Sequence, residues 1–309
     1  MESATGRDAR GTLPEGLGDA LRATAEDIAT VLRGAADTSV PVPRSEWTVG
    51  EAAAHLAQAN ELMADIAAGR ERRYGDGTPQ SLAAANERAL AEFGERAAGP
   101  LAELIVRHTD AYLTAIERCA TDSTGTGDGT GGEPGGGTGR GIGGAAGGAT
   151  GGGAGETAGT VVTPLGPMSR EVLGSYLLTH MLGHGYDLAR ALGRPHMIDR
   201  TRVELSLPFL ITAMPRVADA TTTARLTASY AIRLWGGARF GVTFTDGAVT
   251  VTPRPPARPD CTILIEPVTF LLMALGRIGP NGAMARGRVF ARGHKPWLAL
   301  RFPGLFKAP

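Results

Sequence analysis

The first two thirds of the chain place apolar residues at helical spacing. Leu17, Leu21 and Ile28 open one stripe, with steps of four and seven residues. The same spacing recurs over residues 47–69, 82–93, 100–119 and 169–192. The last stretch stops at a Gly-Arg-Pro sequence, which is typical of a helix end. Because no strand-like alternation separates these stretches, the pattern predicts an up-and-down helical bundle.

The start of the second helix has the clearest local marker. Thr48 and Glu51 stand three residues apart, just ahead of a run of small and apolar residues. This spacing fits a capping box, in which each side chain satisfies a free backbone N–H at the helix start. We therefore expect a helix that begins at Thr48 and runs to about Gly69.

The pattern changes after about residue 197. A helix-like stretch over 203–217 leads into residues 226–234 and 240–244, where every second residue is apolar. Asp246-Gly247 is a strong hairpin turn signal before a further strand. Another strand is expected over 261–265, then a short apolar helix from Pro267 to Leu275, and a final strand or helix in the tail. This order predicts a small α+β domain.

The boundary between the two patterns falls near Pro195, giving an N-terminal bundle over 1–196 and an α+β domain over 197–309. Within the first, residues 121–160 hold 19 glycines in 40 positions. Such a segment has too little apolar surface to offset its ordering entropy. It also lacks the Gly-x-x-x-x-Gly-Lys-Ser/Thr pattern of a phosphate loop. We expect a disordered, functionally silent insertion.

Charge is balanced over the 309 residues but unevenly divided. Lys and Arg total 31, as do Asp and Glu, yet residues 1–223 carry a net −9 and the remainder a net +9. Either the two halves attract each other, or the basic half recruits an anionic small molecule. Nucleic-acid binding is not expected, since neither a Lys-rich helix nor clustered aromatics accompany the basic residues.

Other features of the composition narrow the class of protein. Two cysteines, Cys119 and Cys261, cannot form a multi-disulfide framework or a four-cysteine zinc site. The longest apolar runs are far shorter than the roughly 18–20 residues of a membrane span. The polar N-terminus shows no signal-peptide pattern. We therefore expect a soluble cytoplasmic protein without a membrane partner.

Three histidines fall on predicted helices in a pattern that suits a metal ion. His180 and His184 are four residues apart, so both imidazoles lie on one helix face. His55 lies one turn after Glu51 on another helix. Facing helices of a bundle bring such residues together. Three neutral imidazoles would leave a fourth position open, as catalytic zinc sites do. The alternative is that they are ordinary core or surface histidines.

The remaining candidates leave alternatives open. His108 lies on the apolar stripe of its helix, either as a buried, hydrogen-bonded core residue or as a fourth ligand. Asp187, three residues after His184, either orients a ligand imidazole or is a solvated surface acid. His196 and His294 lie in loop contexts that indicate no role.

Two segments resemble one enzyme family. Residues 47–56 (WTVGEAAAHL) resemble the opening motif of the mycothiol-dependent maleylpyruvate isomerases, a branch of the DinB-like four-helix metalloproteins. Residues 184–195 (HGYDLARALGRP) resemble that family's second motif. The pairs Gly287-Arg288 and Arg292-Gly293 resemble a sterol-carrier-protein-like domain. The resemblance implies a multidomain fold, with a DinB-like bundle followed by a small α+β sterol-carrier-like domain.

The resemblance also implies a chemistry. His55 and His184 take the places of family metal ligands, and His180 stands where the family commonly has Glu. The implied cofactors are a divalent metal, zinc first, and mycothiol as thiol cosubstrate. A metal-activated thiolate would then attack an electrophilic, carboxylated substrate, by isomerisation or S-transfer. The candidates for binding carboxylates are arginines of the basic half: Arg225, Arg233, Arg239, Arg286, Arg288 and Arg292.

The competing hypothesis is a non-catalytic small-molecule or lipid binding protein with a structural or vestigial metal site. In that case Phe270, Leu271, Leu272 and Trp297 would line a cavity between sheet and helix. The alternative for these four residues is an ordinary core.

Overall fold

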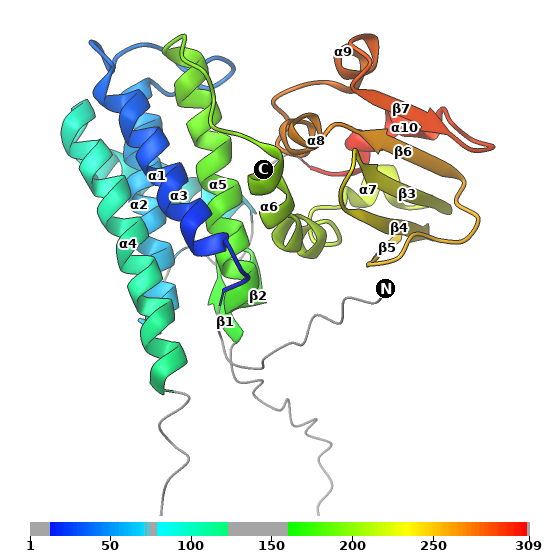
Figure 1. Ribbon diagram of the computed structural model, residues 1–309, viewed down its shortest axis with the longest axis horizontal. Helices are drawn as coiled ribbons and strands as arrows, with labels where there is room; N and C mark the ends of the chain where they lie inside the picture. Colours follow the sequence, from blue (N-terminus) through cyan, green and yellow to red (C-terminus); the bar gives the residue numbers. More distant parts are fainter. Residues whose placement is uncertain (1–12, 71, 73, 75–78, 123–159, 308–309) are drawn as a thin grey trace, which may run out of the picture.

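The computed structural model describes residues 13–70, 72, 74, 79–122 and 160–307. A helical part and a sheet-containing part lie side by side (Figure 1). The helical part is built on α1 (Leu17–Arg33), α2 (Val49–Ala67), α4 (Ala98–Asp122) and α5 (Arg170–Ala191). A shorter helix, α3 (Pro79–Glu92), packs against α2. The predicted four-helix bundle is confirmed.

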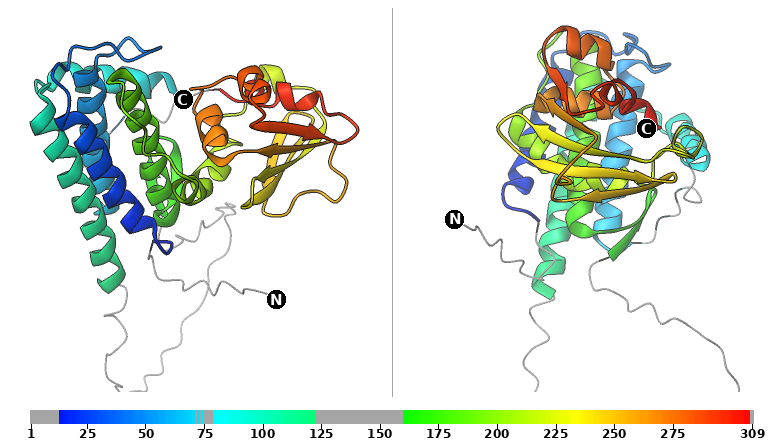
Figure 2. Two further views of the ribbon diagram at one scale, coloured as in Figure 1. Left: turned by 45° about the horizontal axis from the view of Figure 1, so that its top comes forward. Right: turned by 90° about the vertical axis from the view of Figure 1, so that its right-hand side faces the viewer.

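Helix α2 is largely buried in the bundle. Both α1 and α2 pack against α4 and α5, so α1 and α2 occupy opposite corners (Figure 2). Ala52, Ala53, Ala54 and Ala57 are almost wholly buried on α2, and their small side chains let the neighbouring helices approach closely. The helix that carries His55 therefore passes through the interior of the helical part.

A short hairpin precedes α5. Strands β1 (Thr160–Thr163) and β2 (Gly166–Ser169) pair antiparallel, and Ser169 then caps α5 by accepting a hydrogen bond from the Val172 N–H. The sequence pattern missed this hairpin because four-residue strands offer too few alternating positions. The insertion predicted over 121–160 lies outside the described residues except at its ends, where α4 reaches Asp122 and β1 begins at Thr160.

Helix α6 (Arg200–Ala213) joins the two parts and confirms the helix-like stretch expected there. It packs against α5 of the bundle and against α8 (Pro267–Ala274) of the C-terminal part. The domain boundary near residue 196 stays a prediction.

The C-terminal part is organised around a five-stranded sheet. Its strands are β3 (Ala228–Leu234), β4 (Arg239–Thr245), β5 (Ala248–Thr252), β6 (Cys261–Ile265) and β7 (Val289–Arg292). The order is β5-β4-β3-β6-β7, with β3 and β6 parallel and the other pairs antiparallel. Asp246 and Gly247 form the two-residue turn between β4 and β5, with φ of 47° and 88°. Positive φ at both positions matches the expected hairpin turn.

Short helices complete the domain: α7 (Ala220–Thr223), α8, α9 (Pro280–Ala285), α10 (Leu298–Arg301) and the 3-10 turn η2 (Pro303–Leu305). Phe270 of α8 meets Phe240 of the sheet with ring centroids 6.0 Å apart, and Phe270, Leu271 and Leu272 are buried. Trp297 is 58% exposed, so it neither fills the core nor lines a cavity. Leu298 and Ala299 of α10 turn inward and leave the indole outside.

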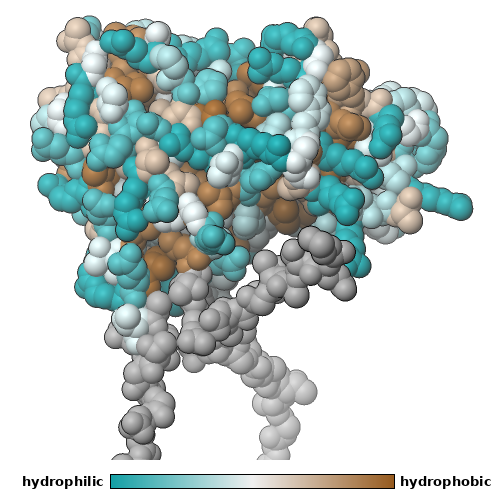
Figure 3. All heavy atoms as spheres, viewed as in Figure 1, coloured by the Kyte–Doolittle hydropathy of each residue, from teal (hydrophilic) through white to brown (hydrophobic). Residues whose placement is uncertain are grey.

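The surface shows polar side chains over most of the face seen in Figure 3, with apolar side chains in smaller patches between them. Among the described helices, none combines the length and the apolar character needed to cross a bilayer.

Candidate metal centre

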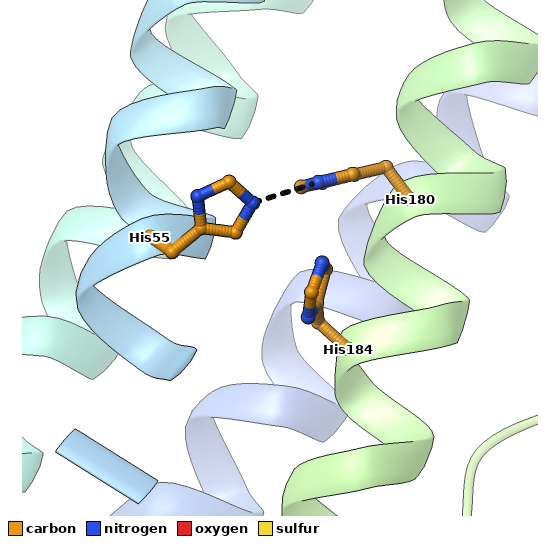
Figure 4. A group of neighbouring side chains, drawn as sticks. All are labelled: His55, His180 and His184. Atoms are coloured by element: carbon orange, nitrogen blue, oxygen red, sulfur yellow. Dashed lines mark hydrogen bonds between the residues drawn. The ribbon is translucent and has the colours of Figure 1, made fainter. Parts of the chain in front are cut away.

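His55 owes its place to the start of α2. Thr48 accepts a hydrogen bond from the Glu51 N–H at 3.3 Å, and the Glu51 carboxylate accepts one from the Thr48 N–H at 2.7 Å. The predicted capping box is therefore present. One turn later, His55 is 7% exposed and points from α2 toward α5 (Figure 4).

His180 and His184 approach from the opposite side, one turn apart on α5 (Figure 4). The ring centroids lie 5.2 Å apart for His55 and His180, 5.0 Å for His55 and His184, and 4.5 Å for His180 and His184. One candidate ligand nitrogen from each residue lies within 4.8 Å of the other two. The structure thus brings together the three histidines that the sequence singled out.

All three imidazoles are neutral near pH 7. Burial lowers the pKa of His55 to about 4. Burial, with smaller contributions from His55 and Arg277, lowers the pKa of His180 to about 3. The pKa of His184 lies well below its usual range, again chiefly through burial. Neutral imidazole is the form that binds a metal, so no proton has to leave before an ion can enter.

The nitrogen positions fit a metal. His55 Nε2 lies 3.2 Å from His180 Nε2. Two nitrogen ligands of a tetrahedral zinc ion, each about 2.0–2.1 Å from it, are roughly 3.3 Å apart. The same 3.2 Å also allows one hydrogen bond between neutral imidazoles. His180 Nδ1, the ring nitrogen on the other side, is buried without a partner among the described residues.

Asp187 is partly buried and bridges to the other half of the chain. Its carboxylate accepts hydrogen bonds from Arg277 Nε at 3.2 Å and Nη2 at 2.7 Å. The distance from Asp187 Oδ2 to His184 Nδ1 is 4.0 Å, longer than a hydrogen bond. Asp187 is therefore neither a solvated surface acid nor a direct orienting partner of His184. Its charge is balanced by Arg277 instead.

Arg277 was missed by the sequence analysis. It lies just after α8 and directly follows Gly276. It belongs to no recognisable motif and to no periodic pattern of apolar residues. Arg277 differs from the six arginines named above in reaching α5 across the domain contact, through its ion pair with Asp187. Its guanidinium adds positive potential beside the cluster, as its effect on the pKa of His180 and His184 shows.

The other histidines have structural surroundings. His108 Nδ1 lies 2.8 Å from the Ala57 carbonyl oxygen, which supports a hydrogen-bonded role within the bundle. His196 Nδ1 accepts a hydrogen bond from the Ile198 N–H at 3.2 Å. His294 lies 3.0 Å from Asp260 in the C-terminal domain. Within the described residues, the metal-type cluster contains only His55, His180 and His184.

Comparison with protein families gives two matches. Residues 14–141 match the mycothiol maleylpyruvate isomerase N-terminal domain, and residues 212–307 match the SCP-2 sterol transfer family. The matches confirm the resemblance seen at residues 47–56 and in the C-terminal domain. His55 lies in the first matched segment, whereas His180 and His184 lie between the two. No curated protein matches the chain.

Solved structures give distant matches. A mycothiol-dependent maleylpyruvate isomerase is 12% identical, with 90% of this chain and 93% of that chain covered and a TM-score of 0.45. A mutant of that isomerase gives 13% identity, the same coverage and a TM-score of 0.47. A stereoselective inverting sec-alkylsulfatase from Pseudomonas sp. is 15% identical over 45% of this chain, with a TM-score of 0.30. This chain covers 24% of the sulfatase chain. Such similarities say nothing about activity.

Proposed function

The chain joins a mycothiol maleylpyruvate isomerase N-terminal domain to an SCP-2 sterol transfer domain, and from this premise we propose a metal-dependent, mycothiol-using enzyme. Its ligands are His55, His180 and His184. The observation that supports this most strongly is the convergence of one nitrogen from each imidazole within 4.8 Å. In this proposal these residues would hold zinc as the resident ion, and mycothiol would be the thiol cosubstrate.

The bound ion supplies one thing: it lowers the pKa of a coordinated thiol, so that a thiolate nucleophile exists at neutral pH. The three histidines favour this because they are neutral, so the charge of a divalent ion is not reduced by its protein ligands. Asp187, whose Oδ2 lies 4.0 Å from His184 Nδ1, is paired with Arg277, and the pair adds no net charge. The centre therefore favours an anionic fourth ligand.

The surrounding residues suit a small anionic substrate. Burial of His55 and partial burial of His180 and His184 limit water at the cluster and strengthen charge interactions there. Arg277 lies beside the site, where its guanidinium charge is balanced by Asp187. Its Nε and Nη2 donate to that carboxylate and its Nη1 donates to the Leu275 carbonyl oxygen, so a substrate carboxylate would have to share these donors.

The proposed reaction begins with addition of the thiolate sulfur to one carbon of a cis double bond conjugated to carbonyl groups. The electron pair of that bond moves toward the carbonyl oxygen, and the carbon–carbon bond becomes single. Rotation about it, followed by loss of the same thiolate, gives the trans product and regenerates the thiol. Where the attacked carbon carries a leaving group, the bond to that group breaks instead of the new carbon–sulfur bond, the group departs with the bonding electron pair, and the sulfur stays attached, which is S-transfer.

The experiment that tests this function is a titration of the cobalt-substituted full chain with mycothiol. Cobalt replaces zinc in such sites and absorbs visible light, and thiolate ligation changes that absorption strongly. We expect a saturable spectral change at one equivalent of mycothiol. The His184→Ala variant serves as control and should show none. A wild-type spectrum that does not respond to mycothiol would rule out thiolate ligation.

A second function keeps support from the SCP-2 match: binding of an apolar small molecule or lipid, with a structural or vestigial metal. The residues expected to line its cavity argue against it, because Phe270, Leu271 and Leu272 are buried core. The coordination shell separates the two functions. A fourth position held by water or added thiol supports catalysis, and a fourth protein ligand supports a structural role.

A further inference from the structure

The indole of Trp47 lies against two of the three clustered histidines. Its ring centroid is 4.8 Å from that of His55 and 6.1 Å from that of His184, and the planes of Trp47 and His184 differ by 27°. His55 belongs to α2 and His184 to α5 (Figure 4). One partly buried side chain therefore contacts candidate ligands on both helices.

The polar partners that usually orient ligand imidazoles are scarce in this cluster. A metal-binding histidine normally donates its second ring N–H to a carboxylate, a carbonyl or water, and this fixes the ring plane. His180 Nδ1 has no partner among the described residues. His184 Nδ1 is 4.0 Å from the carboxylate of Asp187. The hydrogen bond of His55 is to His180 itself, between the two Nε2 atoms. Ring packing is the contact that remains.

Trp47 is itself firmly placed. It lies in a tight turn ahead of α2, closed by a hydrogen bond from the Val42 N–H to the Trp47 carbonyl at 2.9 Å. The Trp47 backbone N–H donates a hydrogen bond to Ser45 Oγ at 3.1 Å. Arg44, with φ of 66°, donates from Nη1 to the Arg277 carbonyl at 3.1 Å. These contacts hold the backbone that carries the indole and tie its turn to the C-terminal domain.

We propose that Trp47 is a positioning residue: its indole holds the rings of His55 and His184 in the converging arrangement that binds the metal. This rests on the proposed function only in taking those histidines as ligands. Trp47 does not touch the ion or the substrate. It fixes the planes of the two imidazole rings by packing against them. In most metal sites, a hydrogen bond to the second ring nitrogen fixes the plane instead.

The test measures zinc affinity of the full chain by competition with a chromophoric chelator. Trp47→Ala should weaken zinc binding about ten- to hundredfold, the usual effect of removing an outer partner of a metal ligand. Trp47→Phe keeps a flat ring and should remain close to wild type. Trp297→Ala is the matched control, because Trp297 is 58% exposed, and should leave the affinity unchanged. Circular dichroism checks the fold of each variant.

Trp47→Leu covers the case in which Trp47→Ala does not fold, since Leu keeps apolar bulk without a flat ring. It should also weaken zinc binding.

Cobalt supplies a second readout, because a bound cobalt ion quenches the fluorescence of a nearby indole. Wild type and Trp297→Phe should lose fluorescence when cobalt binds. Trp47→Phe should not.

Wild-type zinc affinity in folded Trp47→Ala or Trp47→Leu would overturn the positioning role and leave the proposed function standing. A wild-type chain that binds no zinc would overturn the proposed function first. Equal losses in Trp47→Ala and Trp297→Ala would also overturn the positioning role, since the effect would then not depend on contact with the histidines.

Discussion

In the bundle, three imidazoles face one another between α2 and α5 with few protein partners, whereas in the C-terminal domain a partly buried carboxylate is almost fully engaged. Asp260 accepts hydrogen bonds from the Ser229 N–H at 2.8 Å and from Ser229 Oγ at 3.1 Å. It also contacts Lys295 Nζ at 2.8 Å and His294 Nε2 at 3.0 Å.

The difference separates a binding site from a structural clamp. Hydrogen bonding from Lys295 lowers the pKa of Asp260 to about 2, so its charged form is stabilised within the protein. The imidazoles are held neutral by burial, and one nitrogen of each lies within 4.8 Å of the other two. A charged group whose hydrogen bonds are made within the protein stabilises the fold, whereas neutral imidazole nitrogens that face one another can bind a metal ion.

The largest expected effect is on metal binding. His184→Ala removes one of three ligands and should weaken zinc binding by roughly a hundredfold or more, beyond the usual cost of an outer partner. The fold should persist, because each helix buries its own apolar stripe. His108→Ala is the control from the same bundle. It should keep zinc affinity and lose about 1 kcal/mol of stability with its hydrogen bond to Ala57.

Competition with a chelator measures the zinc affinity of each variant, and unfolding by urea measures its stability. If His184→Ala unfolds the chain, the histidine is a structural residue. If His108→Ala loses zinc equally, the distinction between the two histidines is wrong.

Acid should affect the two parts in different pH ranges. An imidazole whose pKa falls from 6.5 to about 4 on folding makes the unfolded chain bind more protons, so bundle stability is lost as the pH falls below 6.5. His55 alone accounts for about 2 kcal/mol by pH 5. Amide hydrogen exchange of the metal-free chain at pH 7.5 and pH 5, corrected for the intrinsic pH dependence of exchange, should show lower protection in α2 and α5 at pH 5, with β3 and β6 little changed. An equal loss of protection in both parts would contradict this.

The Asp260 clamp should respond only at lower pH. Its pKa is lower in the folded chain, so its contribution is full above about pH 4 and is lost as the pH falls toward 2. Asp260→Asn should cost the C-terminal domain about 1–2 kcal/mol near neutral pH, in the range of hydrogen bonds to charged groups. Thermal unfolding in a Trp47→Phe background, followed by the fluorescence of Trp297 and of Trp235 in the turn after β3, measures it. A variant as stable as wild type would show that the clamp is not structural.

The smallest expected effect concerns the start of α2. Thr48→Ala removes the capping side chain and should cost about 1 kcal/mol of stability. Zinc affinity should fall only slightly, because His55 lies two turns into the helix. Thr114→Ala, on the exposed side of α4, serves as control and should cost less than the cap. A stability loss no larger than that of the control would mean that the cap contributes little.

Much of the fold follows from the chain because its signals are local. Helical spacing, the capping box at Thr48 and the turn at Asp246 each depend on residues a few positions apart. The clustering of His180 with His184 is local too, and His55 could be added because facing helices of a bundle meet. These are the features that the structure reproduces.

The rest depends on how distant segments dock. Arg277 meets Asp187 across 90 positions, and nothing beside either residue indicates the pair. The packing of Trp47 on two histidines, and the exposure of Trp297, likewise follow from tertiary placement. The order of helices around the bundle is a further example, since periodicity says which face of a helix is buried but not which helix covers it.

The central claim is that three imidazoles from two helices form one metal centre. X-ray absorption of the zinc-loaded full chain tests it most directly, because imidazole rings give a recognisable scattering pattern beyond the first shell. We predict one zinc per chain with three imidazole ligands and one further non-imidazole ligand. A spectrum with one imidazole or none, or with sulfur from Cys119 or Cys261 in place of the rings, would contradict the account.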